Sequence, residues 1–224
     1  MTKSNTADIN PNVIFTYIPN LIGFTRVATA LLSFFLMKDH PRYTTIIYGI
    51  SCLLDAFDGM AARKYNQSTR FGAVLDMVTD RCSTTSLICF LSVIYPTYYI
   101  LWQLLVSLDL SSHYMHMYAA LSTGSTSHKN IDQSQNVLLR LYYTKKSVLF
   151  TVCMFNELFY MALYLSYYDF MLVPGLAITF PQLLAYVSLP VWFFKQVTNV
   201  IQLAGAAYTL AEIDIKEKSQ SKKE

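Results

Sequence analysis

Six long runs of apolar residues dominate the chain, and each is long enough to cross a bilayer as a helix. A hydrocarbon core of about 30 Å requires about 20 apolar residues of helix. The runs cover residues 20–37, 43–63, 73–95, 97–121, 147–168 and 180–211. The pattern predicts an all-α integral membrane protein, a bundle of six transmembrane helices over residues 1–211 followed by a charged cytosolic tail at 212–224.

The two ends of the chain are more polar than its middle. Residues 1–12 contain no early apolar region, so no secretory signal peptide is expected. Residues 9–18 are short and mixed, which favours a short interfacial helix before Pro19 starts the first span. The tail from Asp214 is charged and polar, and we predict that it is disordered.

Basic residues predict the orientation of the bundle. Six spans place both termini on one side, where eleven Lys and Arg residues fall, against two on the other side. The first group is Lys3, Lys64, Arg70, Lys129, Arg140, Lys145, Lys146, Lys216, Lys218, Lys222 and Lys223, and the second is Lys38 and Arg42. Since basic residues concentrate in cytosolic loops, both termini are predicted to be cytosolic.

The composition agrees with a membrane protein. Hydrophobic residues make up 54% of the 224 residues and charged residues 14%, against about 45–50% and about 25% in soluble domains. These values exclude a disordered chain, a coiled coil and a collagen, and the net charge of +3 gives no indication of nucleic-acid binding. The cysteines lack paired spacing and lie in or beside apolar runs, so we interpret them as reduced packing residues. They are Cys52, Cys82, Cys89 and Cys153.

Four aspartates lie inside two adjacent spans, where an ionised side chain costs about 2.5–3.5 kcal/mol on insertion scales. They are Asp55, Asp58, Asp76 and Asp80. At about 100° per residue, the first two share a helix face with a glycine, and so do the last two. The loop between the spans reverses the chain, so the two faces can meet. A single aspartate could snorkel to water, but four at this spacing indicate a site.

Four converging carboxylates are hard oxygen donors of the kind that Mg²⁺ or Mn²⁺ prefers. Their combined charge exceeds that of one divalent ion, so two ions are predicted. Two metal ions can stabilise both the attacking and the leaving oxygen of a phosphoryl transfer. Asp58 lies about 9 Å along the helix from Lys64. The site is therefore expected just inside the cytosolic leaflet.

The spacing of these residues carries a resemblance to a known family. The pattern is Asp55-x-x-Asp58-Gly59-x-x-Ala62-Arg63, then eight residues, Gly72, three residues, Asp76, three residues, Asp80. It resembles the complete signature of the CDP-alcohol phosphatidyltransferase family, and the six-span layout is also similar. Pro19-Asn20, with Arg26 six residues after Asn20, resembles a second family element, although Gly23 stands where some members have Ser or Thr.

A later segment resembles the eukaryotic members that use inositol. It consists of Asp109-Leu-Ser-Ser-His-Tyr-Met-His-Met-Tyr and Gly124-Ser-Thr-Ser-His-Lys-Asn130. The resemblance implies transfer of a phosphatidyl group from CDP-diacylglycerol to myo-inositol, with release of CMP. It also implies a homodimer among membrane lipids. Together with reduced cysteines and a cytosolic site, the resemblance favours the endoplasmic reticulum membrane.

The resemblance also implies roles for individual residues. Asp55, Asp58 and Asp76 are implied as metal ligands, and Asp80 as the general base that also touches the second metal. Contacts to CDP-diacylglycerol are implied for Asn20, Arg26, Asp55, Gly59, Ala62, Arg63 and Gly72. For Arg63, the alternative is a helix-end cation that snorkels to the membrane surface.

The inositol pocket is less defined in the sequence. Thr126, Lys129 and Lys195 are candidates because their side chains can donate to neutral hydroxyl groups. The alternatives are a solvated loop for the first two and an ion pair, such as one with Glu157, for Lys195. His113 and His116 share a helix face and could form a metal pair, but we favour packed, hydrogen-bonded histidines because the aspartates already account for a metal.

Other functions are weighed against this one. Within the same family, the acceptor could be serine or glycerol 3-phosphate, or a diacylglycerol could attack CDP-choline or CDP-ethanolamine. Intramembrane carboxylates also occur in metal-ion transporters, which often contain repeats and midplane sites, whereas this chain has one cluster near the cytosolic edge. An inactive membrane scaffold has no need for four costly aspartates.

Overall fold

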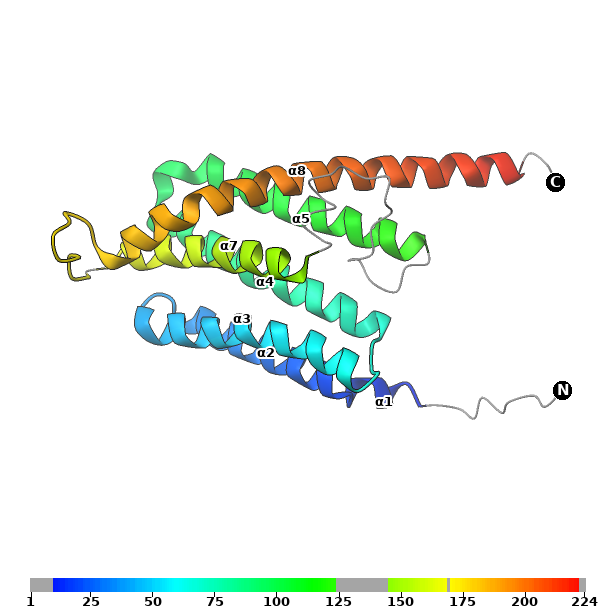
Figure 1. Ribbon diagram of the computed structural model, residues 1–224, viewed down its shortest axis with the longest axis horizontal. Coiled ribbons are helices and arrows are strands. Elements are labelled where there is room, and N and C mark those ends of the chain that lie inside the picture. Colours follow the sequence, from blue (N-terminus) through cyan, green and yellow to red (C-terminus); the bar gives the residue numbers. More distant parts are fainter. Residues whose placement is uncertain (1–9, 124–144, 169, 222–224) are drawn as a thin grey trace. The chain divides into compact units, whose positions relative to one another are not determined.

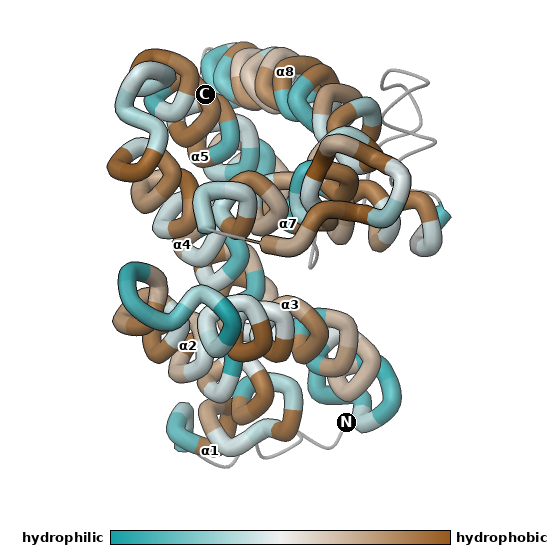
Figure 2. The backbone as a smooth tube through the Cα atoms, turned by 90° about the vertical axis from the view of Figure 1, so that its left-hand side faces the viewer, coloured by the Kyte–Doolittle hydropathy of each residue, from teal (hydrophilic) through white to brown (hydrophobic). Residues whose placement is uncertain are grey.

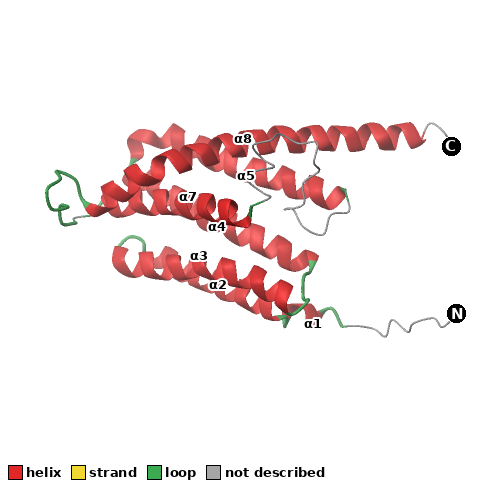
Figure 3. Cartoon of the chain, in the orientation of Figure 1, coloured by secondary structure: helices red, strands yellow, loops and turns green. Residues whose placement is uncertain are grey.

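The computed structural model describes residues 10–123, 145–168 and 170–221. Within these ranges the chain is helical, and the only β contact is an isolated bridge between Leu172 and Thr179 (Figure 3). The helical elements are α1 (Asn12–Phe15), α2 (Ile18–Leu36), α3 (Pro41–Lys64), α4 (Arg70–Ile94), the 3₁₀ helix η1 (Pro96–Tyr98), α5 (Tyr99–Ser122), α7 (Lys146–Ser166) and α8 (Phe180–Ser221) (Figure 1). The all-helical prediction is confirmed.

The chain forms two compact units, Met1–Asp80 and Arg81–Glu224. In the first unit α2 packs along α3. In the second unit α8 packs against both α5 and α7. Helix α4 belongs to both units, because the division falls between Asp80 and Arg81 in its middle. The predicted boundary between a domain at 1–211 and a tail at 212–224 stays a prediction.

Local sequence signals explain where the helices of the first unit begin and end. Helices α2 and α3 carry a proline in their first turn, where the missing N–H would have had no helical partner. The last turn of α3 contains Arg63 and Lys64, whose charges suit the negative end of the helix dipole. Asn66 follows in the left-handed region at φ 53°, a conformation that asparagine tolerates. The chain thereby turns towards α4.

Four helices are long and apolar enough to cross a membrane: α2, α3, α4 and, over Ser147–Ser166, α7. Hydrophobic and hydrophilic positions alternate around the turns of these helices (Figure 2). The chain is therefore a multi-pass membrane protein. The predicted runs 97–121 and 180–211 correspond to the helices α5 and α8. The count of six spans and the orientation of the termini stay predictions.

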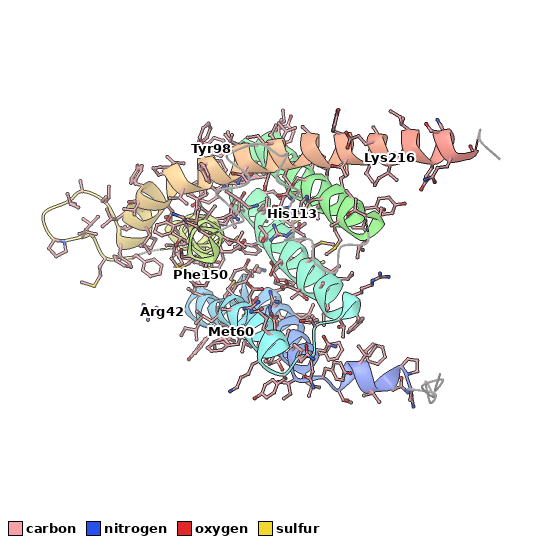
Figure 4. The ribbon with its side chains drawn as sticks, turned by 45° about the vertical axis from the view of Figure 1, so that its right-hand side comes forward. Arg42, Met60, Tyr98, His113, Phe150 and Lys216 are labelled. Carbon is pink, nitrogen blue, oxygen red and sulfur yellow. The ribbon has the colours of Figure 1, made fainter. Side chains whose placement is uncertain are left out.

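The end of the chain differs from the prediction. Helix α8 continues through Asp214 to Ser221, so the expectation of a disordered tail is wrong for the part of it that the structure describes. The physical reason is the spacing of its charges: Glu212 precedes Lys216 by four residues, and Asp214 precedes Lys218 by four. Acidic residues four positions before basic residues stabilise a helix. Lys216 lies on this last part of α8 (Figure 4).

Two smaller predictions have a clear outcome. A short helix does precede the first span, although α1 covers only Asn12–Phe15. Its Phe15 ring meets Phe71 at the start of α4 edge-on, with 5.0 Å between ring centroids. The four cysteines are free, but their interpretation as packing residues does not hold for Cys82 and Cys89, which are exposed, while Cys52 and Cys153 are half-buried.

Candidate active site

The four aspartates gather in the first unit. Asp55 and Asp58 come from α3, and Asp76 and Asp80 come from α4. Carboxylate oxygens of Asp55, Asp76 and Asp80 lie within 4.8 Å of one another. Asp58 is the most buried of the four, with 11% of its side chain exposed, while Asp55 is 41% exposed. We call these four residues the aspartate cluster.

An arginine from α2 lies against the aspartate cluster. Arg26 Nη1 donates to Asp58 Oδ2 at 2.6 Å and to Asp76 Oδ1 at 2.9 Å. Its Nη2 lies 2.8 Å from Asp55 Oδ1 and also donates to Asp80 Oδ1. Only 2% of the Arg26 side chain is exposed. One guanidinium therefore contacts all four carboxylates, and the formal charge of the whole group is −3.

Close helix packing fixes α2 beside α3 and α4. Ser51 Oγ on α3 donates to the Arg26 carbonyl oxygen at 3.0 Å. A Cβ on Gly23 would lie 2.8 Å from Leu75 Cδ2, and one on Gly72 would lie 2.8 Å from Asn20 Oδ1. Glycine at these two positions lets the backbones approach, as small residues do at membrane helix interfaces. The approach brings Arg26 within reach of the cluster.

The loop between α3 and α4 is also tied to α2. The backbone N–H of Ile18, at the start of α2, donates to Gln67 Oε1 at 3.0 Å. Asn20 Nδ2 donates to the carbonyl oxygen of Ile14 at 2.6 Å. Because the first N–H groups of a helix have no helical partner, the bond from Ile18 stabilises the start of α2 against this loop, while the bond from Asn20 joins α2 to α1.

The donor set of the aspartate cluster fits a hard divalent cation. Three carboxylates offer oxygens at a mutual separation that one ion can bridge, and oxygen is the ligand atom that Mg²⁺ and Mn²⁺ prefer. The excess negative charge points the same way, because Arg26 neutralises only one of four carboxylates. Among the described residues, this is the only place where three potential metal-ligating side chains come together.

The remaining residues predicted to contact CDP-diacylglycerol lie on the same helices, α2, α3 and α4. Arg63 lies beside Gly59, since a Cβ at Gly59 would be 3.4 Å from Arg63 Nη1. Arg63 is exposed and Ala62 is half-buried. Asn20 is buried, at 1% exposure, and fills the space left by the missing side chain of Gly72.

Of the three residues predicted to contact inositol, the structure describes only Lys195. Thr126 and Lys129 lie outside the described residues. Lys195 is buried on α8 in the second unit, at 2% exposure. Its Nζ donates to Asn199 Oδ1 at 2.6 Å and lies 3.3 Å from His113 Nε2.

A chain of hydrogen bonds continues from Lys195 to α4. Asn199 Nδ2 donates to Asp109 Oδ1 at 3.5 Å, and Arg81 Nη1 donates to both Asp109 oxygens at 2.7 and 2.9 Å. His113 Nδ1 lies 2.8 Å from the Asp109 carbonyl oxygen. When Nδ1 donates there, Nε2 is left as an acceptor for the Lys195 ammonium. This arrangement agrees with a hydrogen-bonded rather than a metal-binding His113.

A second chain of hydrogen bonds in the same unit links α4, α7 and α8. Glu157 Oε1 accepts from Thr84 Oγ1 at 2.7 Å and from Asn156 Nδ2 at 3.2 Å. Gln196 Nε2 donates to Asn156 Oδ1 at 3.2 Å. We call both chains together the polar network. Its members are Arg81, Thr84, Asp109, His113, Asn156, Glu157, Lys195, Gln196 and Asn199.

Two features were missed by the sequence analysis. The contact between Arg26 and the aspartates was not predicted, although a count of charges could have found it. Four carboxylates inside apolar runs require cations, and Arg26 lies within the preceding run. The Arg81–Asp109 pair was also missed. Opposite charges in two neighbouring apolar runs were the available signal.

Comparison with known proteins places the chain among its relatives. A family model described as CDP-alcohol phosphatidyltransferase matches residues 16–211. A Candida albicans protein named CDP-diacylglycerol–inositol 3-phosphatidyltransferase is 59% identical over 92% of this chain and 87% of its own length. Proteins of the same name from Saccharomyces cerevisiae and Homo sapiens are 50% and 44% identical, over 100% and 93% of this chain and 99% and 98% of their own lengths. No solved structure matches.

Proposed function

The chain belongs to the CDP-alcohol phosphatidyltransferase family, and from this premise we propose that it transfers a phosphatidyl group from CDP-diacylglycerol to myo-inositol. Phosphatidylinositol and CMP are the products. The observation that carries this conclusion is the 59% identity with a relative named for that reaction. The aspartate cluster supports the chemistry, because it gathers four carboxylates from the two helices that carry the family signature.

The aspartate cluster supplies both the metal ligands and the base. Asp55, Asp58 and Asp76 would hold two divalent ions, Mg²⁺ or Mn²⁺, and Asp80 would also serve as a ligand. When bound, the ions neutralise the diphosphate and the leaving oxygen. Asp80 accepts the proton of the attacking inositol hydroxyl at a carboxylate oxygen, since a neutral hydroxyl is a weak nucleophile. The new bond forms at the phosphorus that bears diacylglycerol, and the bond to CMP breaks.

The base role of Asp80 has its own test. Asp80→Asn removes the proton acceptor but keeps a side-chain oxygen and the shape of the residue. We expect the variant to bind metal and CDP-diacylglycerol and to lose turnover. Turnover close to the wild-type rate would exclude Asp80 as the base.

Contacts to CDP-diacylglycerol come from α2, α3 and α4. Gly59 and Ala62 let the nucleotide lie close to the backbone of α3, and Arg63 is available for a phosphate. Arg26 and Asp55 meet the diphosphate at the aspartate cluster. Asn20 and Gly72 act at the same end of the unit, where they pack on each other. Positioning two substrates of opposite solubility supplies much of the rate enhancement.

Inositol contacts are assigned to Thr126, Lys129 and Lys195. Inositol is neutral, so its recognition depends on hydrogen-bond donors and acceptors rather than on a group of cations. Lys195 carries three N–H donors, of which the structure gives one to Asn199 and places another beside His113. For Lys129, Lys129→Ala should raise the KM for inositol more than the KM for CDP-diacylglycerol.

The placement in the membrane is part of the proposal. Six spans, α2 to α5, α7 and α8, place both termini in the cytosol, which the count of basic residues supports. The aspartate cluster then lies near the cytosolic leaflet, where a soluble sugar alcohol and a lipid can both reach it. We assign the chain to the endoplasmic reticulum membrane as a homodimer among membrane lipids.

An acceptor panel on the purified chain tests the function. CDP-diacylglycerol is supplied with Mg²⁺ or Mn²⁺, and CMP release is followed with inositol, serine, glycerol 3-phosphate or water. We expect metal-dependent release with inositol alone. Release with a different alcohol would overturn the acceptor assignment while leaving the family intact. Absence of release from a chain that binds CDP-diacylglycerol would overturn the reaction.

A further inference from the structure

Arg26 occupies an unusual position for a substrate-binding cation. Its two terminal nitrogens contact one oxygen from each of the four aspartates. Its Nε is buried and has no hydrogen-bond partner among the described residues. Among the described residues, every polar contact of the guanidinium is therefore to the aspartate cluster.

The contacted oxygens belong to the same carboxylates that would bind metal. Asp55, Asp76 and Asp80 form the group whose oxygens lie within 4.8 Å of one another, and Arg26 lies on all three. A divalent ion bound there and the guanidinium are like charges drawn to one small set of acceptors. Repulsion between like charges weakens slowly with distance where water is scarce. Arg26 and a divalent ion therefore compete for the cluster.

We propose that Arg26 is a built-in counter-cation, which holds the four aspartates together in the metal-free protein and weakens their binding of divalent ions. The inference rests on the proposed metal site. Without a cation, four carboxylates this close would repel one another, so Arg26 stabilises the arrangement that metal later uses. The same contacts must loosen as metal binds, which lowers the apparent metal affinity. Thermodynamic linkage makes the two effects reciprocal.

Three variants of the full chain in detergent separate this role from a general effect of charge. Arg26→Gln removes the charge, and Arg26→Lys keeps one charge on a single nitrogen that cannot contact four carboxylates at once. Arg42→Gln is the matched control, because Arg42 is an exposed cation on α3 of the same unit (Figure 4). It lies about 20 Å along the helix from Asp55.

Mn²⁺ is the probe, and two properties are measured without lipid substrate. Free Mn²⁺ is followed by its electron paramagnetic resonance signal during titration, and thermal unfolding is followed with EDTA and with Mn²⁺. We expect Arg26→Gln to bind Mn²⁺ about tenfold more tightly than the wild type, and Arg26→Lys to lie between the two. Arg42→Gln should stay within about twofold, because an exposed distant charge is screened.

Stability should change in the opposite direction. In EDTA, Arg26→Gln should unfold at a lower temperature than the wild type, and Mn²⁺ should raise its unfolding temperature by more. If Arg26→Gln binds Mn²⁺ no more tightly than the wild type, the proposal is overturned, because Arg26 would then only position the aspartates. If Arg26→Gln does not fold, the same criterion applies to Arg26→Lys.

The outcomes distinguish this inference from the proposed metal site. Failure of the wild type and both Arg26 variants to bind Mn²⁺ would overturn the metal site, and the competition with it. Binding of Mn²⁺ with equal affinity in all three would keep the metal site and overturn the counter-cation. Addition of guanidinium ion to Arg26→Gln should weaken Mn²⁺ binding, while neutral urea should not. Equal effects of the two additives would also count against competition.

Discussion

The aspartate cluster and the polar network both place charged residues inside apolar helices, but they differ in the balance of charge. The cluster has four carboxylates and one guanidinium. The polar network has two cations, Arg81 and Lys195, and two carboxylates, Asp109 and Glu157. Its Arg81–Asp109 pair is closed by two short contacts.

The net charge of a group of charged residues distinguishes a functional site from a contact that only holds helices together. Polar side chains hold membrane helices together because lipid provides little hydrophobic force between them. A balanced group can satisfy that need with its own members. An unbalanced group favours the uptake of further positive charge, as metal ions or as protons. The net charge of a buried group, rather than the number of its charged residues, therefore points to the site.

The largest expected effect is the loss of turnover on substitution in the aspartate cluster. Asp76→Asn removes a predicted metal ligand and should lower turnover by about a thousandfold. The same change removes one of four repelling charges, so the unfolding temperature in EDTA should stay the same or rise. Activity and thermal unfolding in detergent check both parts. A variant that loses stability in EDTA would show that Asp76 mainly holds the fold through Arg26.

Asp109→Asn should have the opposite signature. It removes the charge of the carboxylate that accepts two hydrogen bonds from Arg81, whose side chain is 12% exposed, and this costs about 3 kcal/mol of stability. Mn²⁺ affinity should be unchanged, because Asp109 is not part of the aspartate cluster. The double variant Arg81→Gln/Asp109→Asn should be more stable than Asp109→Asn alone, since both charges of the pair are removed together. If the double variant loses as much stability as Arg81→Gln and Asp109→Asn lose in sum, the two residues are not coupled. The polar network would then not be held by this charge pair.

Two glycines, Gly72 on α4 and Gly205 on α8, differ in how closely other atoms pack around them. A Cβ at Gly72 would lie 2.8 Å from Asn20 Oδ1 and 3.1 Å from Thr69 Oγ1. Gly72→Ala should therefore cost about 1–3 kcal/mol through overpacking. At Gly205 on α8, nothing described lies within 4 Å of such a Cβ, so Gly205→Ala should gain about 0.5–1 kcal/mol. Thermal unfolding compares the two, and an equal response would contradict the close approach of α2 and α4.

The helices and the four aspartates could be read from the sequence because both depend on local pattern. Apolar runs set the helix positions, and the recurrence of Asp and Gly at helical spacing sets a common face. The state of the tail could not be read from polarity, because the spacing of Glu212 and Lys216 stabilises a helix that polarity alone does not predict.

Contacts between distant segments were harder to predict. The position of Arg26 depends on how closely α2 approaches α4, which Gly23 and Leu75 decide in three dimensions. The same is true of Arg81 and Asp109, which lie 28 residues apart. The sequence indicates that each charge needs a partner, while packing decides which partner it finds.

The smallest expected effect tests whether the balanced region also serves the substrate. Lys195→Met removes the donor to Asn199 and should raise the KM for inositol about fivefold, with the KM for CDP-diacylglycerol unchanged. Gln202→Met is the control, because Gln202 is also buried on α8 and its Nε2 donates to the Ser112 carbonyl oxygen at 3.3 Å. It should affect stability alone. If both variants lower stability and neither changes a KM, Lys195 only holds helices together. The polar network would then have no part in substrate binding. A higher KM for inositol in Lys195→Met alone would show that a cation of the charge-balanced polar network also contacts a neutral ligand.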